Sequence, residues 1–155
     1  MNEWYGVDPC WYLPLERDAK RTMGDRITTE VTVVDQLTYR VAGLEVVGDS
    51  TDHDVTIRFH RHPPYDTVGL PPEDSPRVTS SPRLESPHRF GDDALCLWQP
   101  HDPPARRWTA SLGLLTLVEL VRRHLFLELH WRKTGGRRRG VWLLEDAPHG
   151  LGATA

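Results

Sequence analysis

In PHRFGDDALCLW, residues 87–98, a lone cysteine lies between two leucines, after a polar turn and before a proline-rich loop. A cysteine with leucine neighbours is commonly a small residue of the hydrophobic core. Cys96 nevertheless lies between turn-rich loops instead of inside a periodic element, and a thiol in such a setting can reach the surface and act as a nucleophile. Both interpretations stay open at this point, and we expect the rest of the chain to hold this cysteine at a surface.

The size and composition of the chain predict one globular domain over residues 1–155. Its 155 residues include 38% hydrophobic ones and six tryptophans, enough for a packed core. The net charge of −3 gives no argument for binding nucleic acid or a membrane surface. The two cysteines, Cys10 and Cys96, are too few for a disulfide framework and indicate free thiols in a reducing compartment. No apolar leader segment follows Glu3, so we expect a cytoplasmic protein.

Three stretches have the apolar–polar alternation of half-buried strands. They are Ile27–Val33, Tyr39–Val47 and Val55–His60. The alternation of the second stretch changes phase near Gly43, which predicts a β-bulge. The short connections between the stretches predict an antiparallel meander with one face on the core.

Prolines are frequent on both sides of Cys96. Seven of them lie between residues 62 and 87, and because proline lacks a backbone N–H donor, we expect mostly extended loop there. A short edge strand at Arg77–Thr79 is compatible with this composition and would be the fourth of the sheet. A second proline-rich loop covers Gln99–Arg107.

The stretch Leu112–Trp131 is apolar almost all round and predicts a long helix that is buried against more than one neighbour. Charged residues interrupt it too often for a membrane span. Thr109 or Ser111 is the expected N-cap of this helix. Nearer the N-terminus, Leu15–Met23 predicts a short helix with Pro14 in its first turn. Together with the meander, these helices predict an α+β fold.

Some residues near Cys96 in the sequence could support its chemistry. A thiol nucleophile needs a nearby base or positive charge, and His88, Arg89 and His101 are the nearest candidates. Cys10 lies among aromatic residues, so we interpret it as a packing residue. A thiol hydrolase is a weaker interpretation, because no Asn or Asp is marked as the residue that would orient a histidine.

A metal site is a further candidate. His60, His62 and His88 could be ligands, but no further Cys or His follows at finger-like spacing. We therefore expect surface histidines and no metal. The basic segment Arg132–Arg139 could contact phosphate, although such a run is more often a solvated loop or a complement to a helix C-terminus.

The spacing of residues 72–97 resembles the motif pattern of a known family. Pro72, Pro76 and Val78 match Tyr-Pro-x-x-x-Pro-x-Val, Pro87 matches the proline of His-Pro-Asn, and Leu95-Cys96-Leu97 matches the end of Gly-x-Ile-Cys-Leu. This order of motifs resembles the ubiquitin-conjugating (E2) family, over residues 27–130. The resemblance implies a UBC-like fold, with a short N-terminal helix, a four-strand antiparallel meander, proline-rich active-site loops and a long buried helix.

The resemblance also implies roles for individual residues. Cys96 matches the catalytic nucleophile, and His88 stands where the family has an asparagine that supports the oxyanion or the active-site loop. A histidine can donate a similar hydrogen bond, or act as a base toward an incoming amine. Trp108 matches the tryptophan before the helix, Asp102 is the nearest candidate for an acidic residue after the cysteine, and His101 is a further supporting candidate.

The implied function is that of an E2-like conjugating enzyme. Cys96 would accept a ubiquitin-like protein from an E1-like activating enzyme as a thioester and transfer it to an amine on a protein target. The resemblance implies no metal or organic cofactor and no nucleic-acid or membrane partner. The segments Trp131–Gly135 and Pro148–Gly150 resemble divergent bacterial E2-like proteins that occur beside antiphage and ubiquitin-like conjugation systems. The alternative is a catalytically inactive UBC-fold module that binds a ubiquitin-like protein or a partner enzyme.

Overall fold

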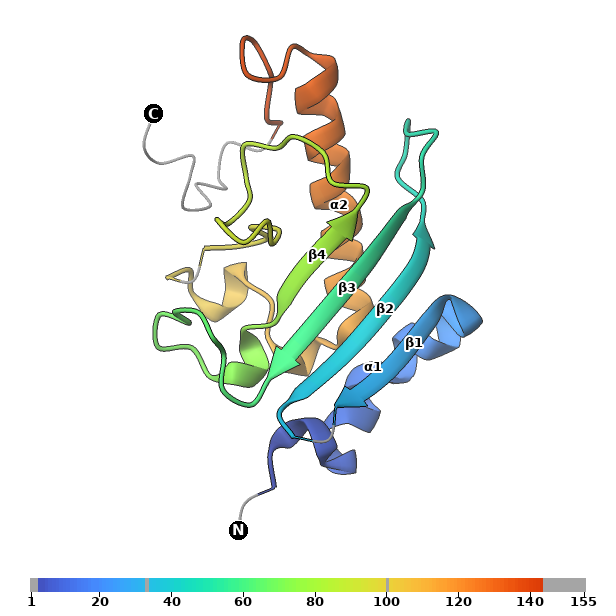
Figure 1. Ribbon diagram of the computed structural model, residues 1–155, viewed down its shortest axis with the longest axis vertical. Helices are drawn as coiled ribbons and strands as arrows, with labels where there is room; N and C mark the ends of the chain where they lie inside the picture. Colours follow the sequence, from blue (N-terminus) through green and yellow to red (C-terminus); the bar gives the residue numbers. More distant parts are fainter. Residues whose placement is uncertain (1–2, 33, 100, 144–155) are drawn as a thin grey trace.

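The fold is built on a four-stranded antiparallel sheet (Figure 1). The structure is a computed structural model that describes residues 3–32, 34–99 and 101–143. The strands are β1 (Ile27–Thr32), β2 (Gln36–Leu44), β3 (His53–His60) and β4 (Arg77–Ser81), and they lie side by side in chain order. The predicted α+β class and the predicted meander are confirmed. Two stretches used above, Val33 and Pro148–Gly150, lie outside the described residues.

The strands bury alternate residues, as their sequence pattern predicts. Along β3 the residues Val55, Ile57 and Phe59 are buried, and each faces a residue of β2 in the antiparallel register. The register of β2 against β3 shifts between Val41 and Leu44. Gly43 has a φ of +62° at this shift, a backbone conformation that glycine adopts without a steric penalty. The predicted bulge is therefore confirmed.

Helix α1 (Pro9–Met23) begins earlier than predicted. The carboxylate of Asp8 accepts a hydrogen bond from the backbone N–H of Cys10 at 2.9 Å and caps the helix, and a proline follows at its first position. The expectation of a helix from Leu15 with Pro14 in its first turn is wrong, because Pro14 lies inside the helix. The Asp8-Pro9 pair is the start signal that the prediction missed.

Helix α2 (Leu114–Lys133) begins later than predicted. Neither Thr109 nor Ser111 caps it; their hydroxyl groups instead bond to one another at 2.8 Å. Residues 110–112 form the short 3-10 turn η5 (Ala110–Leu112). Gly113 then takes a φ of +85°, which turns the chain into the α-helix. The remaining 3-10 turns are η1 (Tyr5–Val7), η2 (Gly24–Arg26), η3 (Pro72–Asp74) and η4 (Pro104–Arg106).

Both α-helices cover the same face of the sheet (Figure 1). Their buried apolar residues form one hydrophobic cluster with the inward residues of the strands. The helix members of this cluster are Leu15, Ala19, Met23, Leu114, Leu117, Val118, Val121 and Leu125. In the described part of the chain, neither helix combines the length and the apolar character that crossing a membrane requires.

Trp108 anchors the proline-rich loop in front of α2. The residue is 0% exposed, and its indole Nε1–H donates a hydrogen bond to the carbonyl oxygen of Gly113 at 2.9 Å. Its ring lies 6.0 Å from that of Phe59 and 6.2 Å from that of Trp98, between ring centroids. Trp108 therefore has a structural place in the core, where it fixes the turn from which α2 starts.

Replacing Trp108 with Phe should lower the free energy of unfolding. The change removes the indole hydrogen bond and leaves the Gly113 carbonyl with only the longer bond from the Leu117 N–H, and the loss of one such hydrogen bond costs about 0.5–1.5 kcal/mol. Urea unfolding followed by circular dichroism measures the effect. Leu112→Ala is the control, because Leu112 is 52% exposed and its loss should change stability by less than about 0.5 kcal/mol. Equal stability of Trp108→Phe and the wild type would contradict the anchoring role.

Candidate active site

Residues 87–97 form a β-hairpin beside the sheet. Arg89 and Leu95 are bridge partners, and the N–H of Phe90 donates to the carbonyl of Ala94 at 2.8 Å. The N–H of Asp93 closes the turn on the carbonyl of Phe90 at 2.9 Å. Asp93 has a φ of +66°, a left-handed conformation that aspartate tolerates better than most residues. The Gly-Asp-Asp sequence thus makes a three-residue hairpin loop.

The register of this hairpin makes His88 and Cys96 direct cross-strand partners. The N–H of Cys96 donates to the carbonyl of His88 at 3.2 Å, two positions along from the bond that joins Phe90 to Ala94. Side chains of directly opposed residues lie on the same face of an antiparallel pair, with Cα atoms about 5.5 Å apart. The structure therefore places together the two residues on which the predicted site depends.

Cys96 is buried, and the expectation of a surface thiol is wrong. Its residue is 1% exposed, and burial raises the pKa of its thiol to about 12, against a smaller lowering effect of the Arg77 guanidinium. The cause of the burial is the docking of the hairpin, whose Leu95 N–H donates to the carbonyl of Val78 in β4 at 2.8 Å. The turn-rich sequence around Cys96 gives no sign that the hairpin folds back onto the sheet.

His88 is also buried, at 6% exposure, so its prediction as a surface histidine is wrong. Its ring packs against that of Trp142, with centroids 4.2 Å apart and planes tilted by 48°. Trp142 also contacts His124 of α2, with centroids 5.3 Å apart. Sequence reasoning did not select Trp142, because it lies 54 positions from His88 in the chain.

The chain brings Trp142 to His88 by turning back after α2. The N–H of Gly136 bonds to the carbonyl of Trp131 at 2.9 Å, and the N–H of Gly140 bonds to that of Gly136 at 2.7 Å. A Cβ at position 140 would lie 2.5 Å from the Trp131 ring, so only glycine fits this turn. The glycine pattern after the helix was the available signal for this reversal.

A buried ion pair fixes the hairpin to α2. The Arg89 guanidinium donates from Nε and Nη2 to the two carboxylate oxygens of Glu128, at 3.0 and 2.8 Å, and from Nη1 to Asp93 at 3.1 Å. His124 bonds to the same carboxylate at 3.0 Å. Burial alone raises the pKa of Glu128, but the hydrogen bonds from His124 and Arg89 outweigh it and lower that pKa to about 2.

Arg89 is therefore not available to assist the thiol. Strand alternation puts Arg89 and Leu95 on one face of the hairpin, and His88 and Cys96 on the other. The guanidinium is committed to Glu128, and the candidate interpretation of Arg89 as a positive charge beside Cys96 is wrong. Arg89 and Glu128 are 39 residues apart, which is why a local pattern could not pair them.

The other predicted site residues lie in the loop after Cys96. His101 is exposed, and Asp102 is half-buried with its carboxylate bonded to the N–H of Gln99 at 3.2 Å. The backbone carbonyl of Asp102 accepts from Arg107 at 3.1 Å, so this aspartate closes its own loop. In the described part of the chain, no hydrogen bond or ion pair connects either residue to Cys96.

Cys10 and the histidines differ in part from expectation. Cys10 is exposed in the first turn of α1, so its interpretation as a packing residue is wrong. His62 is exposed and His60 is half-buried. Within residues 3–32, 34–99 and 101–143, no three His, Cys, Asp or Glu side chains are grouped as metal ligands.

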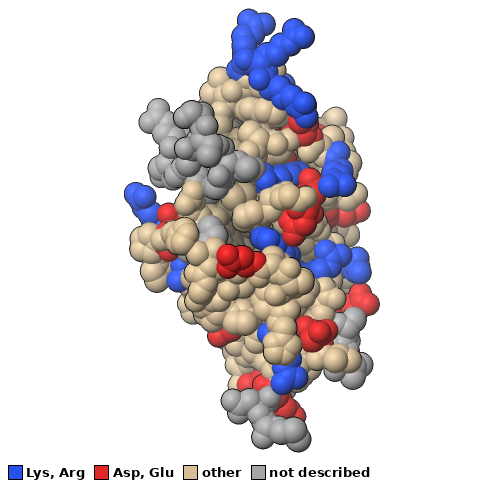
Figure 2. Space-filling model, turned by 60° about the vertical axis from the view of Figure 1, so that its left-hand side comes forward, with Lys and Arg blue, Asp and Glu red and all other residues tan. Residues whose placement is uncertain are grey.

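The basic segment after α2 points into solvent. Arg137, Arg138 and Arg139 are all exposed, and basic side chains gather at this end of the molecule (Figure 2). A solvated loop that continues beyond a helix C-terminus accounts for this arrangement.

We compared the chain with protein-family models, with curated proteins and with solved structures, and none of the three comparisons found a match.

Acid should destabilise the protein through Glu128. The pKa of its carboxyl is about 2 in the fold and 4.5 when exposed, so the unfolded chain binds more protons between these values. The stabilisation is complete above about pH 4.5 and is lost as the pH falls toward 2, on the order of 3 kcal/mol in total. Urea unfolding of the wild type across this pH range measures the loss.

Glu128→Gln should remove this pH dependence and lower stability at pH 7 by about 3–5 kcal/mol, because Arg89 loses its buried counter-charge. Glu119→Gln is the matched control, since Glu119 pairs with Arg122 on the surface and should change stability by less than about 1 kcal/mol. Similar losses in the two variants would contradict a dominant role for the buried pair.

The two thiols should differ in reactivity. In Cys10→Ser, alkylation of Cys96 by iodoacetamide should be slow in the fold and keep accelerating up to about pH 10, because the thiol pKa is about 12. Cys96→Ala reports on Cys10, which should react faster at neutral pH because it is exposed. Mass spectrometry measures both rates, with urea-unfolded protein as the reference. If Cys96 reacts equally fast in the folded and the urea-unfolded protein, the conclusion that Cys96 is buried is wrong.

Proposed function

We propose that this protein is an E2-like conjugating enzyme of UBC-like fold, with Cys96 as the nucleophile that carries a ubiquitin-like protein. The observation that carries the proposal is the register of the hairpin, which pairs Cys96 with His88 beside β4. The order of the surrounding elements supports it: α1, the four-stranded meander, the cysteine hairpin, the loop that ends at Trp108, and the buried α2.

The proposed reaction is two successive acyl transfers. The Cys96 thiolate attacks the thioester that joins the ubiquitin-like protein to an E1-like activating enzyme; a new C–S bond forms and the old one breaks, releasing the cysteine of the activating enzyme. An amine of the protein target then attacks the new thioester. The C–N bond forms, the C–S bond breaks, and the proton lost by the amine is balanced by the proton that Cys96 regains. The chemistry requires no metal or organic cofactor, because the acyl group arrives already activated.

His88 has two roles in this scheme. Its ring shares a face of the hairpin with Cys96, within reach of a thioester carbonyl formed there. A ring N–H can stabilise the oxyanion of the tetrahedral intermediate, and a neutral ring nitrogen can accept the proton of the attacking amine. Either role substitutes for the asparagine that stands at this position in the E2 pattern.

The burial of Cys96 means that the thiol has to be uncovered before it reacts. Trp142 packs on His88, the cross-strand partner of Cys96, and therefore belongs to the cover of the pair. We place the reacting state after the segment that carries Trp142 has moved away from His88. Contact with water then removes the desolvation that raises the thiol pKa.

The proposed setting follows from the same resemblance. The partners are a ubiquitin-like protein, an E1-like activating enzyme and a protein target in the bacterial cytoplasm, within an antiphage or other conjugation system. A second candidate function has an observation in its favour: with Cys96 1% exposed, the domain could serve as an inactive UBC-fold module that only binds a ubiquitin-like protein or a partner enzyme.

The decisive test is thioester formation with an activating enzyme, ATP and the ubiquitin-like protein encoded nearby. The wild type and Cys10→Ser should form an adduct that a thiol reductant cleaves, and Cys96→Ala should form none. Non-reducing gel electrophoresis, with a reduced sample beside it, measures the amount of adduct. Binding without an adduct would favour the inactive module, and loss of the adduct in Cys10→Ser would mean that the wrong cysteine was chosen.

Variants at His88 and Trp142 distinguish the two steps of the proposed reaction, which are thioester formation on Cys96 (charging) and transfer from Cys96 to an amine (discharge). His88→Ala should leave the adduct but slow its discharge to free lysine by roughly 10²-fold, the usual loss of one oxyanion donor or general base. His88→Asn should recover part of that rate. Trp142→Ala should speed charging, because it removes the ring that packs on His88. Unchanged charging and discharge in all three variants would exclude both His88 and Trp142 from the site.

A further inference from the structure

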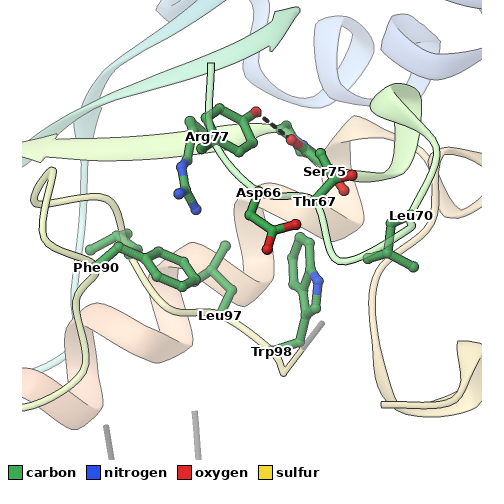
Figure 3. Close-up of a pocket in the computed structure, with 11 residues that line it drawn as sticks. Asp66, Thr67, Leu70, Ser75, Arg77, Phe90, Leu97 and Trp98 are labelled. Carbon is green, nitrogen blue, oxygen red and sulfur yellow. Dashed lines mark hydrogen bonds between the residues drawn. The ribbon is translucent and has the colours of Figure 1, made fainter. Parts of the chain in front are cut away.

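A small pocket lies beside Cys96 but is not lined by it. Leu95 and Leu97 line this pocket, and Cys96 between them is not among its lining residues. Its other walls come from the loop between β3 and β4, from the first residue of β4, and from Phe90 and Trp98 (Figure 3). We call it the Arg77 pocket, after the one cationic side chain among its lining residues.

Arg77 is held rigidly in this pocket. Its guanidinium carbon lies 3.9 Å from the centroid of the Tyr65 ring and 4.2 Å from that of Phe90, so two aromatic rings hold the group. Its Nε is 3.2 Å from a carboxylate oxygen of Asp92. The Tyr65 hydroxyl in turn donates to the carbonyl of Ser75 at 2.5 Å, which fixes the ring (Figure 3).

The terminal nitrogens of Arg77 can donate hydrogen bonds to a ligand. Among the described residues, neither Nη1 nor Nη2 donates a hydrogen bond, and the Arg77 side chain remains 20% exposed. A guanidinium whose position is set by ring contacts presents its terminal N–H groups as a fork, which matches the two oxygens of a carboxylate.

Asp66 supplies an acceptor on the other side of the pocket. One of its carboxylate oxygens accepts the N–H of Val68 at 2.8 Å, which fixes the side chain. Its carboxylate points toward the pocket, between Arg77 and Trp98 (Figure 3). In the part of the chain that the structure describes, Asp66 and Arg77 form no ion pair with each other. The pocket therefore offers separate donor and acceptor groups.

The volume of the pocket limits what can enter it. It measures about 40 Å³, and a single water needs roughly 10–15 Å³ by this kind of measure. A group of about three heavy atoms fits, which is the size of a carboxylate, and the rest of the ligand has to remain outside.

We propose that the Arg77 pocket binds the terminal carboxylate of a peptide chain, with the carboxylate on the Arg77 fork and the N–H of the last peptide bond on Asp66. A terminal carboxylate has such an N–H close by, whereas a free carboxylic acid such as acetate has none. Cys96 does not line this pocket, so the proposal goes beyond the acyl transfer proposed above and is tested separately from it.

The test is an NMR titration of the full chain that follows the indole N–H of Trp98 and the Nε–H of Arg77. The probes are acetyl-Ala-Ala with a free carboxylate, the same peptide as its amide, acetyl-aspartate amide, acetate and phosphate. We expect the free peptide to bind at least about tenfold more tightly than its amide and than acetyl-aspartate amide. Arg77→Gln should lose this binding, while Arg83→Gln, an equal charge change at an exposed arginine, should keep it.

Asp66→Asn keeps the fork intact and tests the second contact. This substitution should weaken binding of the free peptide, because the peptide N–H loses its acceptor. It should strengthen binding of acetate, because the carboxylate of Asp66 no longer repels it. Cys96→Ala should bind all probes with the same affinity as the wild type. Peptide binding can therefore be judged even if no thioester forms on Cys96. Tighter binding of phosphate than of the peptide, equal binding of peptide and amide, or binding that survives Arg77→Gln would each overturn the proposal.

Discussion

The buried ion pair between Arg89 and Glu128 constrains the part of the molecule that holds the candidate site. Glu128 is 0% exposed, and an unpaired charge at such a depth would cost several kcal/mol, so the hairpin has to lie with Arg89 against α2. Once Arg89 faces the helix, strand alternation sends His88 and Cys96 to the opposite face of the hairpin. The geometry of the candidate site is thus a consequence of where one charged pair can be satisfied.

The same docking buries Cys96 and holds its thiol protonated, while Trp142 packs on its cross-strand partner His88. The neighbouring residues Leu95 and Leu97 line a pocket in which two aromatic rings hold the Arg77 guanidinium. A buried, protonated thiol stays inert until a partner uncovers it, which agrees with the proposed acyl transfer because reactivity there comes from the incoming thioester.

Local patterns predicted the sheet well and the helix ends poorly. The alternation in Val55–His60 and the phase change at Gly43 reflect geometry within a few residues, so the meander and its bulge could be predicted. The start of α1 depended on the Asp8-Pro9 cap, a signal that is also local but was overlooked. The start of α2 depended on Gly113 and on the Trp108 indole that bonds to it, a contact that a search for hydroxyl caps does not find.

The sequence by itself determined the strands, the α+β class, and the turn at Gly91–Asp93 that sets His88 opposite Cys96, because each of these depends on residues close together in the chain. Only the tertiary structure decided that Cys96 is buried, that Arg89 belongs to Glu128, that Trp142 covers His88, and that Arg77 lies between two rings. Those outcomes join segments tens of residues apart, and burial and charge pairing are properties of the folded whole that no local periodicity encodes.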